Sequence, residues 1–470
     1  MQSELHFKPA YELAAMIRRR ELKPSELMAA TIARIEQTNP KLNAFVALRT
    51  DAAMAEARAL DEKIARKEEL GPLAGLPLGV KDLEDAAGLP TTHGSVPFRN
   101  LMPKHDSVQV ARLKAAGAIV IGKTNAPEFG YTAHTKNVLF GPTRNPWNLE
   151  RTPGGSSGGS SAAIAAGVVP LATGSDGGGS IRIPACYVGC FGLKPSFGRI
   201  PMDPALGMQQ WNDTSVVGAL TRTVRDTAIF MDVATGYHPV DPDSLPHPGI
   251  SYAAMLDRLP KKLRIAFHPD FGRVVQRDVS REVEKAVAVF RDMGHEITVI
   301  TDAPPETGNA WQRVGGGQGL AMLWEYIDPH RSEFGRSFLS GTEAAKHLTW
   351  RHYGEAYRTR LQFNEWIRAI FERFDLMLTP TLPTEAYPAK GPMPSEINGK
   401  KLDNPLEAVV FTYPINLSGH PAASVRAGFT DSGLPCGLQI VAERHRDDLV
   451  LQASYAYEQA RPWNAKWPEI

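Results

Sequence analysis

Two glycine-rich segments of the sequence contain serines that could carry out acyl transfer. Residues 154–160 read GGSSGGS, and residues 176–184 read DGGGSIRIP. Acyl transfer to a serine requires an activated hydroxyl and hydrogen-bond donors for the negative charge that develops on the attacked carbonyl oxygen. Glycines have no side chain to block that oxygen, so the second segment offers its backbone N–H groups as candidate donors. These are the amides of Gly177, Gly178, Gly179 and Ser180.

The first segment also matches G-x-S-x-G, the nucleophile elbow of α/β-hydrolases, with Ser156 as the attacking residue. That motif requires a strand immediately before it, whereas residues 145–153 read NPWNLERTP and are typical of a loop. An elbow serine also needs a histidine base, and none of the 13 histidines stands out. The sequence therefore disfavours an elbow at Ser156.

Lys81 is a candidate general base. It ends an apolar, strand-like segment in LPLGVKDLED, residues 76–85, which would carry the amine into the interior. Burial lowers the pKa of a lysine, and a neutral amine near pH 7 can accept a proton. Taken alone, Lys81 is better explained as a solvated lysine or as the ion-pair partner of Asp82 or Glu84.

Two further motifs have simpler structural explanations. GAIVIGKT at 117–124 matches the P-loop pattern, but its interior is apolar and Asn-Ala-Pro follows at once, so we expect a strand that ends in a turn. Cys186 and Cys190 are four residues apart, and Cys436 is the third cysteine. Metal sites need more ligands than these, so we expect buried, free thiols and no metal.

The elements that must position these residues alternate between helix and strand. The first 70 residues have helical periodicity, and we then expect a strand at 76–80, a helix at 108–115 and a strand at 118–121. The alternation continues with a helix at 281–293, strands at 297–300, 375–380 and 437–441, and a closing helix at 449–458. The pattern predicts an α/β fold with a mixed sheet between helical layers.

The bulk composition narrows the class of protein. Among 470 residues, 52 are basic and 51 acidic, so no overall charge attracts nucleic acid or an anionic membrane. The N-terminus carries several charges and resembles no secretory signal, and no stretch approaches the roughly 20 apolar residues of a membrane helix. Three cysteines argue against a disulfide framework. We expect a cytoplasmic protein with neither a nucleic-acid nor a membrane partner.

Several motifs together resemble the amidase signature family. They are GVKD at 79–82, KTNAPEFG at 123–130, GPTRNPWN at 141–148, GGSSGGS at 154–160, GSDGGGSIRIP at 174–184, GLKPSFGRI at 192–200 and GLPCGLQIV at 433–441. The resemblance implies a single large α/β/α domain over residues 1–470, with a mixed twisted sheet covered by helices on both faces. Residues 1–70 would form a helical segment packed on it, and residues 75–200 the catalytic core.

The resemblance also implies a Ser-Ser-Lys triad that hydrolyses linear or cyclic amide bonds without a cofactor. Ser180 matches the nucleophile, which forms an acyl-enzyme. Ser156 matches the bridging serine, which follows a cis peptide bond, here Gly155–Ser156. Lys81 matches the base. Lysine would take a proton from Ser156 and Ser156 one from Ser180, and the relay would then run backward to protonate the leaving amine.

Further site residues follow from the same resemblance. Gly130 and Tyr131 would line the acyl pocket, although Tyr131 is equally open to a role as a core aromatic. Ser157, Asp176 and Arg182 would support the loop and helix start around Ser180. The family position that matches Gly177 usually carries Thr, Ile or Ala, so this loop has more backbone freedom than is usual.

Sequence features disfavour two alternative functions. A glutaminase subunit of a tRNA-dependent amidotransferase would share the triad, but that branch has an SSLDQ-like segment where this chain reads QQWNDTS at 209–215. An inactive binding scaffold is disfavoured because all three triad positions are intact. The leading prediction is an amidase that acts on a small-molecule amide of unspecified structure, with a homodimer expected as the commonest assembly. Residues 311–353, with GGGQG at 315–319, could shape a pocket mouth, but a hinge or a cluster of glycines that allows close packing is favoured.

Overall fold

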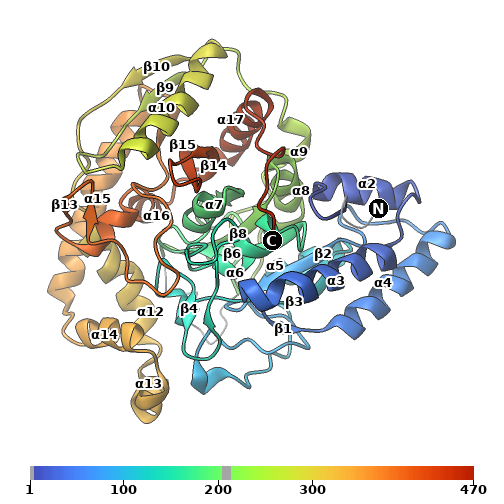
Figure 1. The fold of residues 1–470 in the computed structure, drawn as a ribbon. Helices are drawn as coiled ribbons and strands as arrows, with labels where there is room; N and C mark the ends of the chain where they lie inside the picture. The colour runs from blue at the N-terminus through green and yellow to red at the C-terminus, as the bar shows by residue number, and fades with distance from the viewer. Residues whose placement is uncertain (1–4, 204–212) are drawn as a thin grey trace.

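A computed structural model describes residues 5–203 and 213–470. Its centre is a sheet of 11 strands covered by helices (Figure 1). In spatial order the strands are β1 (Phe45–Leu48), β3 (Ile119–Thr124), β2 (Pro77–Lys81), β6 (Leu171–Asp176), β8 (Val216–Thr221), β7 (Phe191–Lys194), β14 (Ala422–Phe429), β15 (Pro435–Ala442), β11 (Leu376–Pro380), β9 (Arg264–Phe267) and β10 (Glu296–Val299). The predicted α/β fold class is confirmed.

The sheet is mixed, as predicted. β2 pairs in parallel with both β3 and β6, and β9 pairs in parallel with β10 and β11. The pairs β1–β3, β6–β8, β7–β8, β7–β14, β14–β15 and β11–β15 are antiparallel. β2 and β3 are buried along their whole length because they are continuous apolar runs with helices on both faces.

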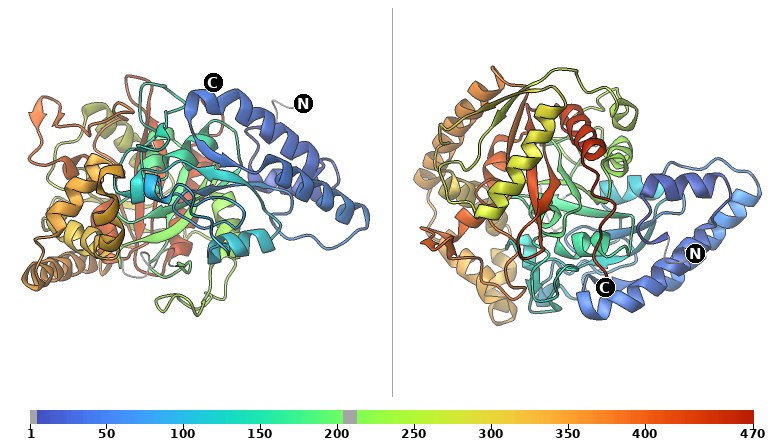
Figure 2. Two further views of the ribbon diagram at one scale, coloured as in Figure 1. Left: turned by 90° about the horizontal axis from the view of Figure 1, so that it is seen from below. Right: turned by 45° about the horizontal axis from the view of Figure 1, so that its top comes forward.

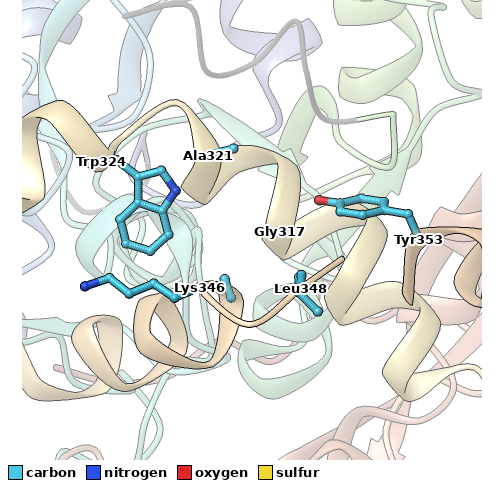
Figure 3. Close-up of a pocket in the computed structure, with 7 residues that line it drawn as sticks. Gly317, Ala321, Trp324, Lys346, Leu348 and Tyr353 are labelled. Atoms are coloured by element: carbon cyan, nitrogen blue, oxygen red, sulfur yellow. The ribbon is translucent and has the colours of Figure 1, made fainter. Parts of the chain in front are cut away.

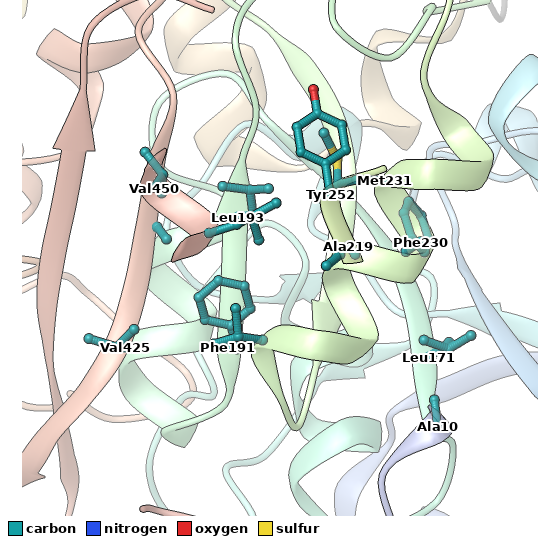
Figure 4. Close-up of a cluster of buried hydrophobic side chains, with 14 of the residues drawn as sticks. Ala10, Leu171, Phe191, Leu193, Ala219, Phe230, Met231, Tyr252, Val425 and Val450 are labelled. Carbon is teal, nitrogen blue, oxygen red and sulfur yellow. The ribbon is translucent and has the colours of Figure 1, made fainter. Parts of the chain in front are cut away.

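Alternate residues of each strand face opposite helical layers, which places a hydrophobic core on each side of the sheet. On β3, Val120 packs in one core, whereas Ile119 and Ile121 pack in the other. The first core, part of which is drawn in Figure 4, contains Phe191, Leu193, Leu27 and residues of six helices that lie on this face of the sheet. These are α2 (Ala10–Arg18), α5 (Val108–Ala115), α8 (Val224–Ala234), α9 (Tyr252–Met255), α10 (Arg277–Asp292) and α17 (Asp447–Ala460).

The opposite face of the sheet is covered by six other helices. They are α3 (Pro24–Leu42), α4 (Thr50–Ala65), α6 (Gly158–Ala165), α7 (Arg182–Val188), α15 (Trp350–Phe371) and α16 (Tyr413–Ser418). The predicted helices on both faces are therefore confirmed. Residues 5–70 contain α2, α3 and α4, but the prediction of helices alone is wrong at residues 45–48, because β1 pairs with β3 at the edge of the sheet. α6 and α7 directly follow the two serine-containing segments and are fully buried.

A second group of helices lies at the opposite end of the molecule from α2, α3 and α4 (Figure 2). It consists of α11 (Gly308–Trp311), the π-helical turn η5 (Gln312–Gly316), α12 (Gly317–Ala321), α13 (Trp324–His330), the turn η6 (Arg331–Glu333) and α14 (Arg336–Ala345). Smaller elements are the strands β4 (Lys136–Asn137), β5 (Gly141–Pro142), β12 (Glu396–Ile397) and β13 (Lys400–Lys401), and the 3₁₀ turns η1 (Val96–Phe98), η2 (Glu128–Gly130) and η7 (Pro405–Val409).

Three local predictions from the sequence can be compared with the structure. The P-loop match at 117–124 contains β3 and is a strand, as expected. Residues 145–153 form a loop with isolated bridges, so no strand leads into Ser156 and an elbow is excluded. All three cysteines are free and buried. Within the described ranges, no helix is long and apolar enough to cross a membrane.

Candidate active site

Two parallel neighbouring strands bring the candidate residues to one edge of the sheet. Lys81 is the last residue of β2, and Asp176 is the last residue of β6. Because these strands run in parallel, their carboxyl ends meet at the same edge, where open α/β sheets form their ligand sites. Ser156 lies between a loop and α6, and Ser180 lies between β6 and α7, so both serines stand just before a helix beside that edge.

Lys81 and Ser156 form a buried hydrogen bond. The Nζ of Lys81 donates to Ser156 Oγ at 2.7 Å, and the two residues are 1% and 2% exposed. Lys81 Nζ also donates to Ser175 Oγ at 2.9 Å and lies 3.5 Å from the Ser175 carbonyl oxygen. Burial lowers the pKa of Lys81 to about 7, against the attraction of Asp176 and Glu84. A substantial fraction of this amine is therefore neutral at neutral pH.

The backbone before Ser156 has the form that the sequence resemblance implied. The peptide bond Gly155–Ser156 is cis. Gly154 has a positive φ of 87°, and a Cβ at this position would clash with the backbone of Pro184 in α7. The close packing of the first glycine-rich segment against the helix that follows Ser180 ties the two serine-containing segments together.

Ser157 and Asp176 hold the second segment in place. The Ser157 N–H donates to the Ser180 carbonyl at 3.2 Å, which is a direct link between the two segments. The Asp176 carboxylate accepts hydrogen bonds from the backbone of Gly179 at 2.7 Å and Ile181 at 3.2 Å. It also accepts bonds from Arg182 Nε and Nη2, both at 2.9 Å. These residues therefore make the supporting contacts expected of them.

The Asp176–Arg182 ion pair is fully buried. Burial alone would raise the pKa of Asp176, but the charge and hydrogen bonds of Arg182 hold it below its usual value. Arg182 additionally donates to Asn416 Oδ1 and Gln439 Oε1, both at 2.7 Å, so both partners are satisfied. Arg182 is thus a structural residue rather than an exposed substrate contact.

The amides of the glycine loop differ in what they bind. The Gly179 N–H, one of the four predicted oxyanion donors, is engaged by Asp176 and cannot donate to a substrate at the same time. Within the described part of the chain, the amides of Gly177, Gly178 and Ser180 donate to no other group. The candidate donor set is therefore corrected from four amides to these three. The reason is the short turn after β6, which folds the loop back onto the Asp176 carboxylate.

The Ser180 hydroxyl is half-buried and forms no hydrogen bond to a described residue. Its backbone position is fixed on both sides, because Gly179 has a φ of 125° and α7 begins two residues later. The structure therefore joins Lys81 to Ser156 by a hydrogen bond but shows none between the hydroxyls of Ser156 and Ser180.

Gly130 lies beside Ser156, and Tyr131 follows it in the chain. Gly130 has a φ of 71°, and a Cβ there would lie 3.2 Å from Ser156 Oγ. Tyr131 is 39% exposed, so the alternative of a core aromatic is wrong. Its ring packs edge-on against Phe338 of α14, with centroids 5.8 Å apart, and its hydroxyl occupies the space beside Gly341. Tyr131 thus joins the edge of the site to the helices at 308–371.

A separate cavity of about 310 Å³ lies within those helices (Figure 3). It is lined by Gly317, Ala321, Trp324, Ala345, Lys346, Leu348 and Tyr353. None of the predicted site residues lines it. A Cβ on Gly317 would clash with Tyr353 and Leu348, so this glycine of the GGGQG segment serves close helix packing.

Four residues around the site were not identified from the sequence. Ser175 lies inside the GSDGGGS motif, where its spacing from Ser180 could have drawn attention to it. Trp311, Thr412 and Asn416 come from distant segments. The Nδ2 group of Asn416 donates to the Asp176 carbonyl oxygen at 2.8 Å, and Trp311 and Thr412 bind the glycine loop. No motif marks these three positions.

Comparisons with known proteins show which family the chain belongs to. The family model described as Amidase matches residues 26–451. An acylamidase from Rhodococcus erythropolis is 37% identical over 99% of this chain and 98% of its own. A glutamyl-tRNA(Gln) amidotransferase subunit from Moorella thermoacetica is 35% identical over 99% of both chains. The crystal structure of a bacterial aryl acylamidase of the amidase signature family superimposes with a TM-score of 0.93, at 33% identity and 98% coverage of each chain.

The chain therefore belongs to the amidase family, as its motifs indicated. It is a hydrolase that acts on amide bonds.

Proposed function

We propose that this amidase hydrolyses its substrate through an acyl-enzyme on Ser180, with Ser156 as the proton relay and Lys81 as the general base. The observation that carries the proposal is the buried 2.7 Å hydrogen bond between Lys81 Nζ and Ser156 Oγ. A lysine whose pKa lies at about 7 can accept a proton at neutral pH. All three residues fall within 75–200, the region predicted as the catalytic core.

The first half of the reaction acylates the enzyme. Neutral Lys81 takes the proton of Ser156 Oγ while Ser156 Oγ takes the proton of Ser180 Oγ, which then bonds to the substrate carbonyl carbon. The carbonyl π electrons move onto oxygen, where the amides of Gly177, Gly178 and Ser180 can stabilise the charge. When the C–N bond breaks, Ser156 passes a proton to the leaving nitrogen and regains one from the Lys81 ammonium.

The second half releases the acid. A water molecule gives a proton to the same relay as its oxygen attacks the acyl carbon, and the C–O bond to Ser180 breaks with return of that proton to Ser180 Oγ. Every proton transfer uses a side chain of the enzyme, so the proposed steps require no cofactor.

We further propose that the substrate is a small N-acyl amide. The relatives at 37% and 33% identity are named an acylamidase and an aryl acylamidase. Gly130 packs closely beside Ser156, and the partly exposed ring of Tyr131, the next residue, is the aromatic wall that we propose for the acyl group. An apolar acyl or aryl group would gain from burial against that ring.

Kinetics of two serine variants test this function. A panel of anilides and alkyl amides that differ in acyl and amine size would first identify the best substrate. We expect Ser180→Ala to abolish turnover and Ser156→Ala to leave weak residual turnover, with thermal melting used to confirm that both variants fold. Normal turnover by Ser180→Ala would contradict the proposal.

A glutaminase subunit of a tRNA-dependent amidotransferase is the second candidate, since a relative at 35% identity carries the name of such an amidotransferase. The sequence disfavours it because QQWNDTS stands at 209–215, where that branch has an SSLDQ-like segment. Residues 209–212 lie outside the described residues. Size-exclusion chromatography with a glutaminase assay separates the two functions. Glutamine hydrolysis that depends on a partner protein would favour the glutaminase, and turnover of anilides by the isolated chain favours the amidase.

The remaining predictions concern the surroundings of the enzyme. We expect a small-molecule amide as its partner, no nucleic acid or membrane, a cytoplasmic location and a homodimer. Light scattering coupled to size-exclusion chromatography measures the assembly directly.

A further inference from the structure

Each glycine of the loop before Ser180 is packed against a side chain from a distant segment. A Cβ on Gly177 would clash with Ser215 Oγ, one on Gly178 with the indole of Trp311, and one on Gly179 with Thr412 Oγ1. Ser215 directly precedes β8, Trp311 ends α11, and Thr412 directly precedes α16. The Gly177 backbone therefore does not have the freedom that its composition suggests, because neighbouring elements fill the space that a side chain would occupy.

Two of these side chains also bind the loop carbonyls. The Trp311 Nε1–H donates to the Gly177 carbonyl oxygen at 2.7 Å. The Thr412 hydroxyl donates to the Gly178 carbonyl oxygen at 2.8 Å and lies 2.9 Å from the Val409 carbonyl oxygen. The carbonyl oxygens of two successive peptide units are thus held from outside the loop.

Holding a carbonyl also fixes the next N–H. In a trans peptide the C=O of one residue and the N–H of the next share a plane and point in opposite directions, and both loop peptides are trans. The bond to Thr412 therefore fixes the Gly179 N–H, which donates to Asp176 and not to a substrate, so Thr412 acts on the Gly178 N–H only by holding the peptide that follows it. The bond to Trp311 fixes the Gly178 N–H, which points away from the indole and donates to no described group.

We propose that Trp311, together with Thr412, is a positioning residue for the oxyanion hole. Its indole N–H holds the peptide unit of Gly177 so that the Gly178 N–H stays aimed at the oxygen that becomes charged in the reaction. This rests on the proposed acyl-enzyme on Ser180. Preorganised amides are effective because they need no reorientation as charge develops.

Trp311 itself is held in place by several contacts. Its backbone N–H donates to the Thr307 carbonyl at 2.8 Å, and its ring packs on Tyr413 with centroids 5.5 Å apart. The indole also lies against Gly178. A phenylalanine at this position would keep most of the ring contact and lose only the N–H donor. Trp311→Phe is therefore a suitable test variant, and Trp324→Phe, which lies in the separate cavity, is a matched control.

The test measures steady-state kinetics on the best amide of the panel and the affinity for an alkyl trifluoromethyl ketone. Such a ketone forms a hemiketal oxyanion on an attacking serine, so it reports on the oxyanion donors. We expect Trp311→Phe to lower kcat and the ketone affinity by roughly tenfold, the size of one hydrogen bond, while KM changes by less than about twofold. Trp324→Phe should match the wild type in all three quantities.

A second pair of variants covers the case in which Trp311→Phe does not fold. Thr412→Val should lower kcat and ketone affinity, and Thr412→Ser, which keeps the hydroxyl, should restore both. Wild-type kcat and ketone affinity in Trp311→Phe or in Thr412→Val would overturn the positioning role. Labelling of wild-type Ser180 by a fluorophosphonate, located by mass spectrometry, is run in parallel. Absence of that label would contradict the acyl-enzyme itself, so the two failures are distinguishable.

Discussion

The Nζ of Lys81 lies 2.7 Å from Ser156 Oγ, and both residues are almost completely buried. Both residues stand at the carboxyl edge of the sheet, and the Gly155–Ser156 peptide is cis. A buried amine that contacts a serine hydroxyl is poised to exchange a proton with it, because burial disfavours the ammonium form. The sheet edge that positions Lys81 and Ser156 therefore also sets up the first proton transfer of the proposed mechanism.

The pH dependence of kcat/KM should reveal this lysine. Burial lowers its pKa to about 7, so the neutral base is lost as the pH falls through 7. We expect kcat/KM to be constant above that pH and to drop about tenfold per pH unit below about 6, with a single ionisation. A profile that stays flat from pH 5 to 9, on an amide whose own protonation does not change, would exclude Lys81 as the base.

Replacement of the lysine should cost activity but increase stability. In Lys81→Met the buried amine is removed, so the free energy of unfolding at pH 7 should rise by on the order of 1–3 kcal/mol. The folded-state pKa lies below the unfolded value, so wild-type stability rises with pH between about 7 and 10.5, and the gain of the variant should shrink over that range. Urea unfolding at several pH values measures both effects. A variant that is less stable than the wild type at pH 7 would contradict this argument.

Glu458 should destabilise the protein in alkaline solution. Burial, with a contribution from the charge of Asp226, raises the pKa of Glu458 to about 8. The folded state therefore keeps a proton that the unfolded chain loses near its usual pKa of 4.5, and stability falls as the pH rises from about 4.5 to 8.

In Glu458→Gln that fall should be reduced, because the amide carries no charge and can still accept the hydrogen bond of the Val224 N–H. We expect the variant to exceed the wild type by roughly 1–3 kcal/mol at pH 9 and to match it near pH 5. Glu69→Gln, at an exposed position, is the control and should behave as the wild type at both pH values. Equal stability of Glu458→Gln and the wild type at pH 9 would show that ionisation of Glu458 does not lower the free energy of unfolding.

Tyr131 should influence the choice of acyl group. Its ring is partly exposed beside Gly130 and packs on Phe338. We expect Tyr131→Ala to raise KM about tenfold for amides with a bulky apolar acyl group, which lose a contact surface, and to change KM for acetyl amides by less than about twofold. The control is Tyr237→Ala, on an exposed loop tyrosine. An equal change in KM for both acyl groups would show that Tyr131 does not contact the acyl group.

The sequence predicted those features that local chemistry encodes. The apolar run that ends at Lys81 formed β2, and the strands predicted at 297–300, 375–380 and 437–441 and the helix predicted at 449–458 lie within a few residues of β10, β11, β15 and α17. The strand β14 between them was not predicted. The glycine-rich motifs indicated Ser156 and Ser180 because the residue types in these motifs, and the order of the motifs along the chain, can be recognised without a structure. The alternation of helical and strand-like segments also predicted the mixed α/β fold, since continuous apolar strands require helical cover on both faces.

The contacts between distant segments could not be predicted in this way. Trp311 is 134 residues from Gly177, and Thr412 is 234 residues from Gly178. Nothing in either local sequence distinguishes a tryptophan or threonine that binds a loop carbonyl from one that only packs. The same limit explains Gly179, whose amide is engaged by Asp176 because of the tertiary turn rather than because of its residue type.

The most direct measurement is the site of the acyl group during turnover. Trypsin leaves Ser156 and Ser180 in one peptide, whereas a protease that cleaves before aspartate separates them at Asp176. Acid quenching of the wild type with a slowly hydrolysed amide, followed by this digest and mass spectrometry, should place the acyl mass on the peptide that contains Ser180. The mass should be absent from Ser180→Ala. An acyl group on the Ser156 peptide, or equal acylation of Ser180→Ala, would contradict the account.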